Sequence, residues 1–164
     1  MKIITPQDFH SATSGKHILL DTSIFIDAFL HPSEFAEFLN RLKDNNCTLV
    51  TVRPVLIEFL KGSTTDKKLD EKKTFVESII ESYLPITDDI FDNVLDLIRQ
   101  YRIEGKDLSL TDFILGGVVL KYKRSIYLLT KDISDFPTNI FTRVTYFNLF
   151  HRKAIQNIGV YSAV

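Results

Sequence analysis

Short apolar runs alternate along the chain with longer stretches whose apolar residues recur at helical spacing. The run 17–20, which ends at Asp21, and the β-branched run 47–52 predict buried strands. Residues 34–44 and 89–104 place their apolar side chains on one face, as amphipathic helices do. We therefore predict strands over 17–20, 47–52, 125–130 and 141–149, an extended stretch over 83–87, and helices over 22–30, 34–44, 54–60 and 89–104, with 61–80 passing from loop to helix.

Polar and special residues mark where the helices begin and end. The pair His31-Pro32 ends the first long helix, and Ser33 is a suitable N-cap for the next one. Gly62 closes the helix over 54–60. Either Ser109 or Thr111 caps a further helix that runs to about residue 123. Because short strands alternate with helices, we predict an α/β fold, a three-layer sandwich with a mainly parallel central sheet.

The composition fits one folded domain over residues 1–164. Hydrophobic residues make up 45% and charged residues 25% of the chain, as in ordinary globular proteins. The formal net charge is −1, so a face that binds nucleic acid must be basic only locally. The lone Cys47 excludes an intrachain disulfide and a cysteine-rich zinc site, and it suggests a reducing location such as the cytoplasm. No apolar run approaches the ~20 residues that span a bilayer, so we expect no membrane segment.

Acidic residues recur at the ends of the predicted elements. Asp21 directly follows the first strand and Asp132 follows the strand over 125–130, so both belong at the carboxyl edge of the sheet, where ligands bind in open α/β folds. Asp112 lies in the first turn of a helix. Glu58 lies in an otherwise apolar helical stretch, and a buried lone carboxylate is unfavourable unless something pairs with it.

A shared divalent cation accounts for all of these acids together. Carboxylates that gather at one edge repel one another without a cation. Mg²⁺ prefers oxygen ligands in octahedral geometry and retains several waters. Such an ion lowers the pKa of its bound water and orients the attack on phosphorus, so the pattern predicts metal-assisted hydrolysis of a phosphodiester.

Each acid also has a simpler structural role when it is considered alone. Asp21 can cap the helix that follows it, and Asp112 can lie at the positive end of a helix dipole. Asp132 and Asp135 can form turns within a loop. Asp27, one to two turns into the first long helix, is expected to be a solvated or capping acid.

Four sequence pieces contain the candidate acids, in this order: Leu20-Asp21-Thr22-Ser23, Arg53-Pro54-Val55-Leu56-Ile57-Glu58, Leu108-Ser109-Leu110-Thr111-Asp112 and Leu129-Thr130-Lys131-Asp132-Ile133-Ser134-Asp135-Phe136. Together they resemble the PIN-domain family, and especially the VapC-type toxins of bacterial and archaeal toxin–antitoxin pairs. The resemblance covers about residues 17–150. Each piece alone is common, whereas four in order on suitable elements are fairly specific.

The resemblance implies a metal-dependent endoribonuclease whose Mg²⁺ or Mn²⁺ ligands are Asp21, Glu58, Asp112 and Asp132. Asp135 matches an additional acid, and family members differ in which of the last two contributes. Ser23 and Thr130 match polar positions that support the site through hydrogen bonds. The resemblance also implies an RNA substrate, a small antitoxin as partner, and often a homodimer. The chain departs from a compact toxin in its added terminal residues and in the charged segment 61–73.

Other functions are weighed against the nuclease. The same fold can act as a catalytically silent scaffold that binds RNA or protein; the complete set of acids favours the nuclease, and stabilisation by Mg²⁺ or Mn²⁺ would separate the two. A phosphatase of the haloacid-dehalogenase type needs an Asp two positions after the first, where this chain has Ser23. A dinucleotide enzyme needs a Gly-x-Gly-x-x-Gly motif after the first strand, and the chain lacks it.

Overall fold

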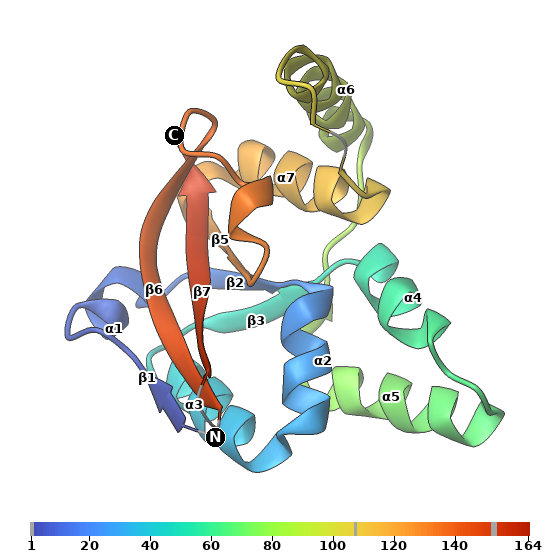
Figure 1. The fold of residues 1–164 in the computed structure, drawn as a ribbon, viewed down its shortest axis with the longest axis vertical. Coiled ribbons are helices and arrows are strands. Elements are labelled where there is room, and N and C mark those ends of the chain that lie inside the picture. Colours follow the sequence, from blue (N-terminus) through green and yellow to red (C-terminus); the bar gives the residue numbers. More distant parts are fainter. Residues whose placement is uncertain (1, 107, 152–153) are drawn as a thin grey trace.

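The computed structural model describes residues 2–106, 108–151 and 154–164 of the chain. Its elements are shown in Figure 1. In chain order they are β1 (Lys2–Ile4), α1 (Phe9–Thr13), β2 (His17–Leu20), α2 (Thr22–Leu30), α3 (Pro32–Asp44), β3 (Thr48–Thr51), α4 (Arg53–Lys61), α5 (Asp66–Ile79), β4 (Ser82–Tyr83), α6 (Asp88–Ile103), α7 (Leu110–Tyr122), the 3-10 turn η1 (Lys123–Ser125), β5 (Ile126–Thr130), the 3-10 turn η2 (Ile133–Asp135), β6 (Phe141–His151) and β7 (Ala154–Ala163).

The described strands form one mixed sheet in the order β1-β6-β7-β5-β2-β3-β4. The half made of β5, β2, β3 and β4 is parallel. The half made of β7, β6 and β1 is antiparallel, and it joins the parallel half through the pairing of β7 with β5. The predicted α/β fold is therefore confirmed, and the parallel half has the carboxyl ends of β2 and β5 at one edge.

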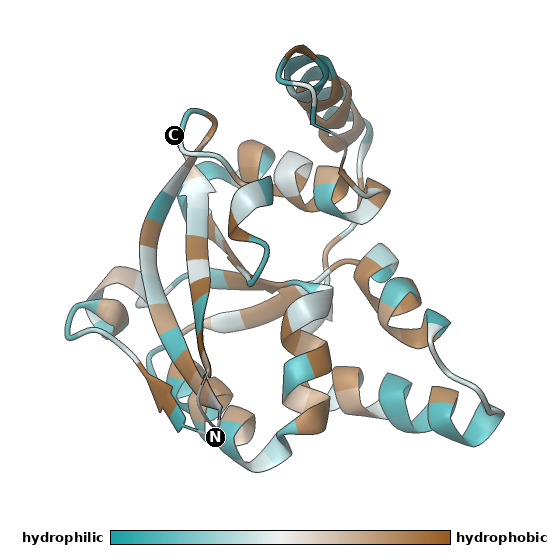
Figure 2. Cartoon of the chain, viewed as in Figure 1, coloured by the Kyte–Doolittle hydropathy of each residue, from teal (hydrophilic) through white to brown (hydrophobic). Residues whose placement is uncertain are grey.

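The central strands are covered on both faces by helices. In β2, Ile18, Leu19 and Leu20 are each at most 1% exposed, and successive strand residues point to opposite faces. All five residues of β5 are likewise buried. By contrast, Figure 2 shows that α5 is largely hydrophilic in the half that follows the loop from α4. Burial on both faces of consecutive strand residues is what the predicted three-layer arrangement requires.

The two ends of the chain contain elements that the hydrophobic pattern did not predict. β1 and α1 precede the first predicted strand, and β7 follows the strand that was predicted to be the last, so that prediction is wrong. β7 lies between β5 and β6 inside the sheet. The first part of β7 is exposed and its second part is continuously buried. The strand therefore lacks the alternation of apolar and polar residues by which a half-buried strand is predicted from sequence. The added terminal residues are therefore part of the sheet.

The helix boundaries follow the expected chemistry with one correction. Ser33 is not an N-cap, because α3 already begins at Pro32, at the helix start where proline is favoured. Ser109, rather than Thr111, caps α7, and its side chain accepts a hydrogen bond from the amide of Asp112. Among the described residues, no helix is both long and apolar enough to cross a bilayer.

Glycine brings α6 and α7 into close contact above the sheet (Figure 1). A Cβ atom built on Gly117 would lie 2.9 Å from the carbonyl oxygen of Ile90 and 2.9 Å from Cγ2 of Val94. Asn93 of α6 also donates a hydrogen bond to the Gly117 carbonyl at 3.2 Å. The pair of helices thus packs at a distance that only glycine permits at this position.

Candidate active site

Asp21 forms the buried base of the site at the carboxyl end of β2. Its side chain is 2% exposed. One carboxylate oxygen, Oδ1, accepts from the amide of Thr22 at 2.5 Å, as an N-cap does. The other, Oδ2, accepts from the hydroxyls of Ser23 at 2.8 Å and Thr130 at 2.7 Å. Since three donors from two elements hold this carboxylate, its orientation is fixed.

Thr130 joins the ends of the two central strands. Leu20 of β2 pairs in register with Leu129 of β5, so the residues that follow them lie side by side. The Thr130 hydroxyl donates to Asp21 and accepts from the backbone amide of Asp132 at 3.0 Å. This single hydroxyl therefore turns the chain after β5 towards Asp21. The supporting position predicted for Thr130 has the geometry that such a role requires.

Asp112 enters the site from the first turn of α7. The Ser109 hydroxyl donates to Oδ2 of Asp112 at 2.5 Å and accepts from its amide at 3.1 Å. This reciprocal cap fixes the start of the helix and the Asp112 carboxylate together. The side chain is half-buried.

Glu58 lies close enough to Asp112 for their charges to repel, although the premise that singled Glu58 out is wrong. The sequence argument treated it as an acid buried among apolar neighbours, whereas Glu58 is exposed on α4. Its apolar neighbours Val55, Leu56 and Phe59 point into the core instead. The Thr22 hydroxyl donates to Oε2 of Glu58 at 2.6 Å, which ties α4 to the start of α2. Sequence reasoning missed Thr22, and its place between Asp21 and Ser23 was the available signal.

Asp135 lies in η2 and is held through its backbone. The hydroxyl of Tyr101, a buried residue of α6, donates to the carbonyl oxygen of Asp135. The Ser134 hydroxyl donates to Oδ1 of Asp135 at 3.1 Å. Tyr101 was not predicted as a site residue, because a tyrosine on the apolar face of a helix reads as core. The structure thus links the outer helix α6 to the loop that carries two of the candidate acids.

Burial and mutual repulsion act on these carboxylates. The pKa of Asp112 is raised to about 6, mainly by burial. The hydrogen bond from Ser109 opposes this rise. Three neighbouring acids add to it: Asp21, Asp135 and Glu58. An acid feels such repulsion only from charges nearby, so these residues from separate elements converge.

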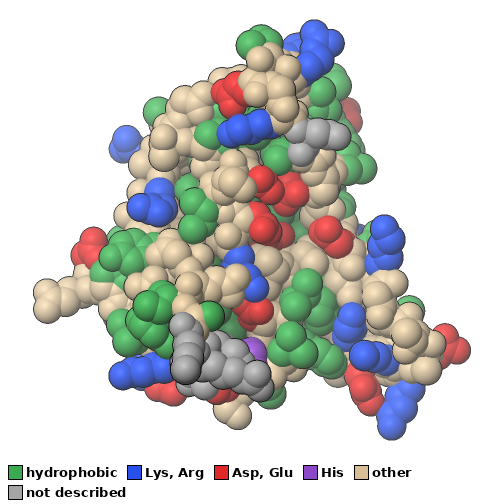
Figure 3. All heavy atoms as spheres, in the orientation of Figure 1, with side chains coloured by type: hydrophobic (Ala, Val, Ile, Leu, Met, Phe, Trp, Pro, Cys, Tyr) green, Lys and Arg blue, Asp and Glu red, His purple; other side chains and the backbone are tan. Residues whose placement is uncertain are grey.

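Asp21 and Asp132 show the same pattern. Burial raises the pKa of Asp21, hydrogen bonds from Thr130 and Ser23 oppose the rise, and the charge of Asp132 adds to it. Partial desolvation likewise raises the pKa of Asp132, with further increases from neighbouring acids, while the charge of Lys131 lowers it. Figure 3 shows Asp and Glu side chains gathered near the centre of this face. All five predicted acids are therefore electrostatic neighbours.

The donor set fits a hard divalent cation. The groups that converge are carboxylates, and two of them are buried at least in part while they repel one another. Mg²⁺ and Mn²⁺ prefer such oxygen ligands, and a cation would relieve the repulsion. Among the residues described, no three acidic, histidine or cysteine side chains already converge on one point at ligand spacing.

An ion pair between Lys131 and Asp27 lies beside the candidate acids. Lys131, between Thr130 and Asp132, extends its ammonium to Asp27 of α2, and Nζ lies 3.0 Å from Oδ1 and 2.9 Å from Oδ2. The side chain of Asp27 is 13% exposed. The expectation that Asp27 is a solvated or capping acid is therefore wrong, because it forms a largely buried ion pair.

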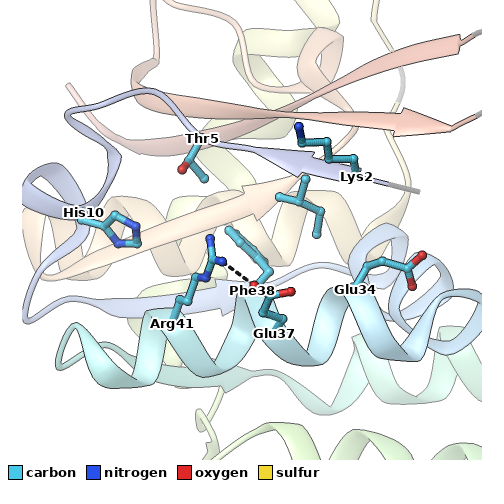
Figure 4. Close-up of a pocket in the computed structure, with 8 residues that line it drawn as sticks. Lys2, Thr5, His10, Glu34, Glu37, Phe38 and Arg41 are labelled. Atoms are coloured by element: carbon cyan, nitrogen blue, oxygen red, sulfur yellow. Dashed lines mark hydrogen bonds and ion pairs between the residues drawn. The ribbon is translucent and has the colours of Figure 1, made fainter.

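A cavity of about 310 Å³ lies between β1, α1 and α3 (Figure 4). Lys2 and His10 line one side, and Glu37 and Arg41, which form an ion pair, line the other. No candidate site residue lines this cavity. The proposed chemistry therefore does not involve it.

Comparison with known protein families identifies the matched part of the chain. The family model described as PIN domain matches residues 18–136, well over half of the chain. No curated protein matches the chain. The matched range begins within β2 and ends directly after η2, so it contains all of the candidate site residues.

Proposed function

Because the chain belongs to the PIN domain family, a nuclease-type fold, we propose that it is a metal-dependent endoribonuclease that hydrolyses RNA phosphodiesters with Mg²⁺ or Mn²⁺. One observation carries this proposal: acids from four separate elements repel one another at the carboxyl edge of the parallel strands. Ligands bind at this edge in open α/β sheets. A surface where several carboxylates gather without an equal number of cations is suited to bind a cation and, through it, a phosphodiester.

The acids differ in depth, and this gradient indicates how the site would be used. Asp21 is buried at the base, Asp112 is half-buried, and Glu58 and Asp132 are exposed at the rim. Asp21 and Asp112, which hydroxyl and amide donors fix, would hold the metal. Glu58 and Asp132 would complete the ligand set from the solvent side, where RNA approaches. When bound, the ion supplies a water of lowered pKa and neutralises charge on the phosphate oxygens.

The direct test is cleavage of RNA by the purified protein. The wild type and Asp21→Asn are incubated with labelled single-stranded RNA and with total RNA, with EDTA, Mg²⁺ or Mn²⁺. We expect cleavage by the wild type only with metal, and a cleavage rate lower by about 100-fold or more in Asp21→Asn, because the variant loses a metal ligand. Each factor of ten in rate corresponds to about 1.4 kcal/mol of transition-state stabilisation. Asp88→Asn, an exposed first-turn acid of α6, is the matched control and should cleave normally.

The alternative is the catalytically silent scaffold that binds RNA or protein. Wild-type protein that leaves every RNA intact with both metals, and that gains no thermal stability from either metal, supports the scaffold and contradicts the nuclease. Retained folding of Asp21→Asn, measured by circular dichroism in EDTA, is needed to assign its loss of activity to the site.

The finer proposal is that the protein is the toxin of a type II toxin–antitoxin pair with a small antitoxin partner. It rests on the resemblance of the four sequence pieces to VapC-type toxins, as does the possible homodimer. Induced expression should then arrest bacterial growth, and Asp21→Asn should abolish the arrest. Normal growth on expression of a protein that cleaves RNA in vitro contradicts the toxin role but not the nuclease.

A further inference from the structure

The ion pair between Lys131 and Asp27 lies next to the site but includes none of the proposed ligands. Both side chains are largely buried, with 19% of Lys131 and 13% of Asp27 exposed. The ammonium lies 3.0 Å from Oδ1 and 2.9 Å from Oδ2 of Asp27, and among the described residues no other group donates to the buried Oδ2. The Lys131 charge is therefore what compensates this carboxylate. Buried ion pairs contribute little net stability, so a specific role for this one is worth testing.

The pair closes a set of contacts between α2 and the turn after β5. Two successive residues, Thr130 at the end of β5 and Lys131 after it, make three contacts with α2 or with the residue that caps it. The Thr130 hydroxyl donates to Asp21, the Lys131 amide donates to the Ser23 hydroxyl at 3.2 Å, and the Lys131 ammonium binds Asp27. The side chain of Lys131 thus extends the contacts with α2 from Ser23 to Asp27, which is one helical turn further along that helix.

Asp132 depends on this attachment. Among the described residues, its carboxylate accepts no hydrogen bond, whereas its amide donates to Thr130. Its side chain is exposed at the rim. The place of the Asp132 carboxylate is therefore set by the backbone of the turn, in contrast to Asp21 and Asp112, whose carboxylates are held directly.

We propose that Lys131 and Asp27 are a positioning pair, in which Asp27 on α2 holds the Lys131 ammonium and thereby keeps the Asp132 carboxylate beside Asp21 for metal binding. This inference rests on the proposed nuclease site and adds two residues that no ligand set includes. A direct contact of Lys131 with an RNA phosphate is the competing role. The burial of the ammonium and its existing partner favour positioning, because a phosphate contact requires the pair to break first.

The test compares Asp27→Asn, Lys131→Met, the double variant and Lys131→Arg with the wild type. Mn²⁺ affinity is measured from the thermal shift against metal concentration, and kcat and KM are measured on single-stranded RNA. We expect Mn²⁺ binding to weaken about 10-fold or more in Asp27→Asn and Lys131→Met, as for other residues that orient metal ligands. In the same two variants kcat should fall, while KM for RNA should stay unchanged. Lys131→Arg should retain most of the Mn²⁺ affinity and most of kcat.

A readout without metal separates positioning from the chemistry. Hydrogen exchange at the amides of residues 131 and 132 should accelerate in the metal-free Asp27→Asn protein, since both amides are bonded within the held turn. The double variant removes both charges and leaves neither stranded, so it should fold even if a single variant does not. It should still show weak Mn²⁺ binding and fast exchange.

Lys121 and Asp89 provide the matched control, because they form an ion pair at 2.9 Å between α7 and α6, outside the site. Lys121→Met should keep wild-type Mn²⁺ affinity and kcat. Unchanged Mn²⁺ affinity and exchange in the Lys131 and Asp27 variants overturns the positioning pair while the wild-type enzyme still cleaves RNA. A raised KM for RNA with a salt dependence weaker by about one charge, and unchanged Mn²⁺ affinity, also overturns it in favour of a phosphate contact. Wild-type protein that binds no Mn²⁺ refutes the proposed function as well.

Discussion

Replacing Asp112 by Asn should stabilise the metal-free protein while it destroys the proposed metal site. The pKa of this carboxyl is raised from 3.8 to about 6, so its ionised form is destabilised in the folded protein near neutral pH. An amide has nearly the same shape, carries no charge and can still accept the hydrogen bond from Ser109. The substitution therefore removes a charge that burial, and to a lesser extent the other acids, destabilises, and it keeps the cap of α7.

The magnitude follows from the pKa. A shift of about 2 pKa units corresponds to at most about 3 kcal/mol, and partial exposure of the side chain reduces this to about 1–2 kcal/mol. Loss of a favourable acid in the first turn of a helix subtracts about 0.3–1 kcal/mol. The net gain in the free energy of unfolding should be about 1 kcal/mol, which raises the Tm of a domain of this size by roughly 2–4 °C.

The difference in stability between the wild type and Asp112→Asn should depend on pH. Below about pH 4 the Asp112 carboxyl is protonated in both the folded and the unfolded chain, so the two proteins should unfold alike. Between about pH 4 and 6 the folded wild type binds more protons than its unfolded chain, and its stability relative to the Asn variant falls as the pH rises. Above about pH 6 the difference should be constant at its largest value.

Thermal unfolding in EDTA from pH 3.5 to 8, followed by circular dichroism, measures this difference. The order should reverse with Mn²⁺, because metal that binds the folded wild type at 100 times its dissociation constant adds about 2.7 kcal/mol, and the variant should gain much less. Asp88→Asn, a first-turn acid of α6, should not gain stability in EDTA. If Asp112→Asn is destabilised in EDTA as much as Asp88→Asn, the argument that burial and neighbouring acids destabilise the Asp112 charge is refuted.

Two further predictions concern the residues that shape the site. Thr130→Val removes the hydroxyl shared by Asp21 and the Asp132 amide, so it should lower both the free energy of unfolding, by about 1–3 kcal/mol, and the rate of RNA cleavage. Thr51→Val, which loses one buried hydrogen bond to the Leu20 carbonyl, should lower stability alone, and equal cleavage by the two variants contradicts the role of Thr130. Gly117→Ala places a methyl group 2.9 Å from the Ile90 carbonyl oxygen and should lower stability by about 1–3 kcal/mol in urea unfolding; an unchanged midpoint would mean that α6 shifts freely on α7.

The sequence predicted the parallel half of the fold well, and the reasons are local. In β2 and β5 the strands are short, apolar and followed directly by polar residues, so their ends are visible in the sequence. In β7 the burial changes halfway along the strand, from exposed at Ala154 to buried at Ile158, and no single period describes it. Its place between β5 and β6 depends on pairings with residues far away in the chain, which a local pattern does not contain.

The site shows a different relation between sequence and structure. Asp21 and Asp132 were placed by strand ends, and the topology of parallel strands brings such ends together whatever the side chains do. Glu58 was chosen for the wrong reason, because its apolar neighbours face the core while Glu58 itself is exposed. The periodicity of a helix puts a charged residue on the opposite face from its apolar neighbours.

What holds Glu58 in the site is a hydroxyl from another element, and this kind of contact recurs. The Thr22 hydroxyl of α2 binds Glu58 of α4, and the Thr130 hydroxyl of β5 binds Asp21 at the start of α2. The Tyr101 hydroxyl binds the backbone beside the Asp135 carboxyl. Thr22 lies next to an acid in the sequence, but the partner of each of these hydroxyls is set by how the sheet and the helices α2, α4 and α6 pack. A sequence can therefore name the acids, whereas the packed helices determine which donors hold each acid in place and hence which ones remain free to bind a cation.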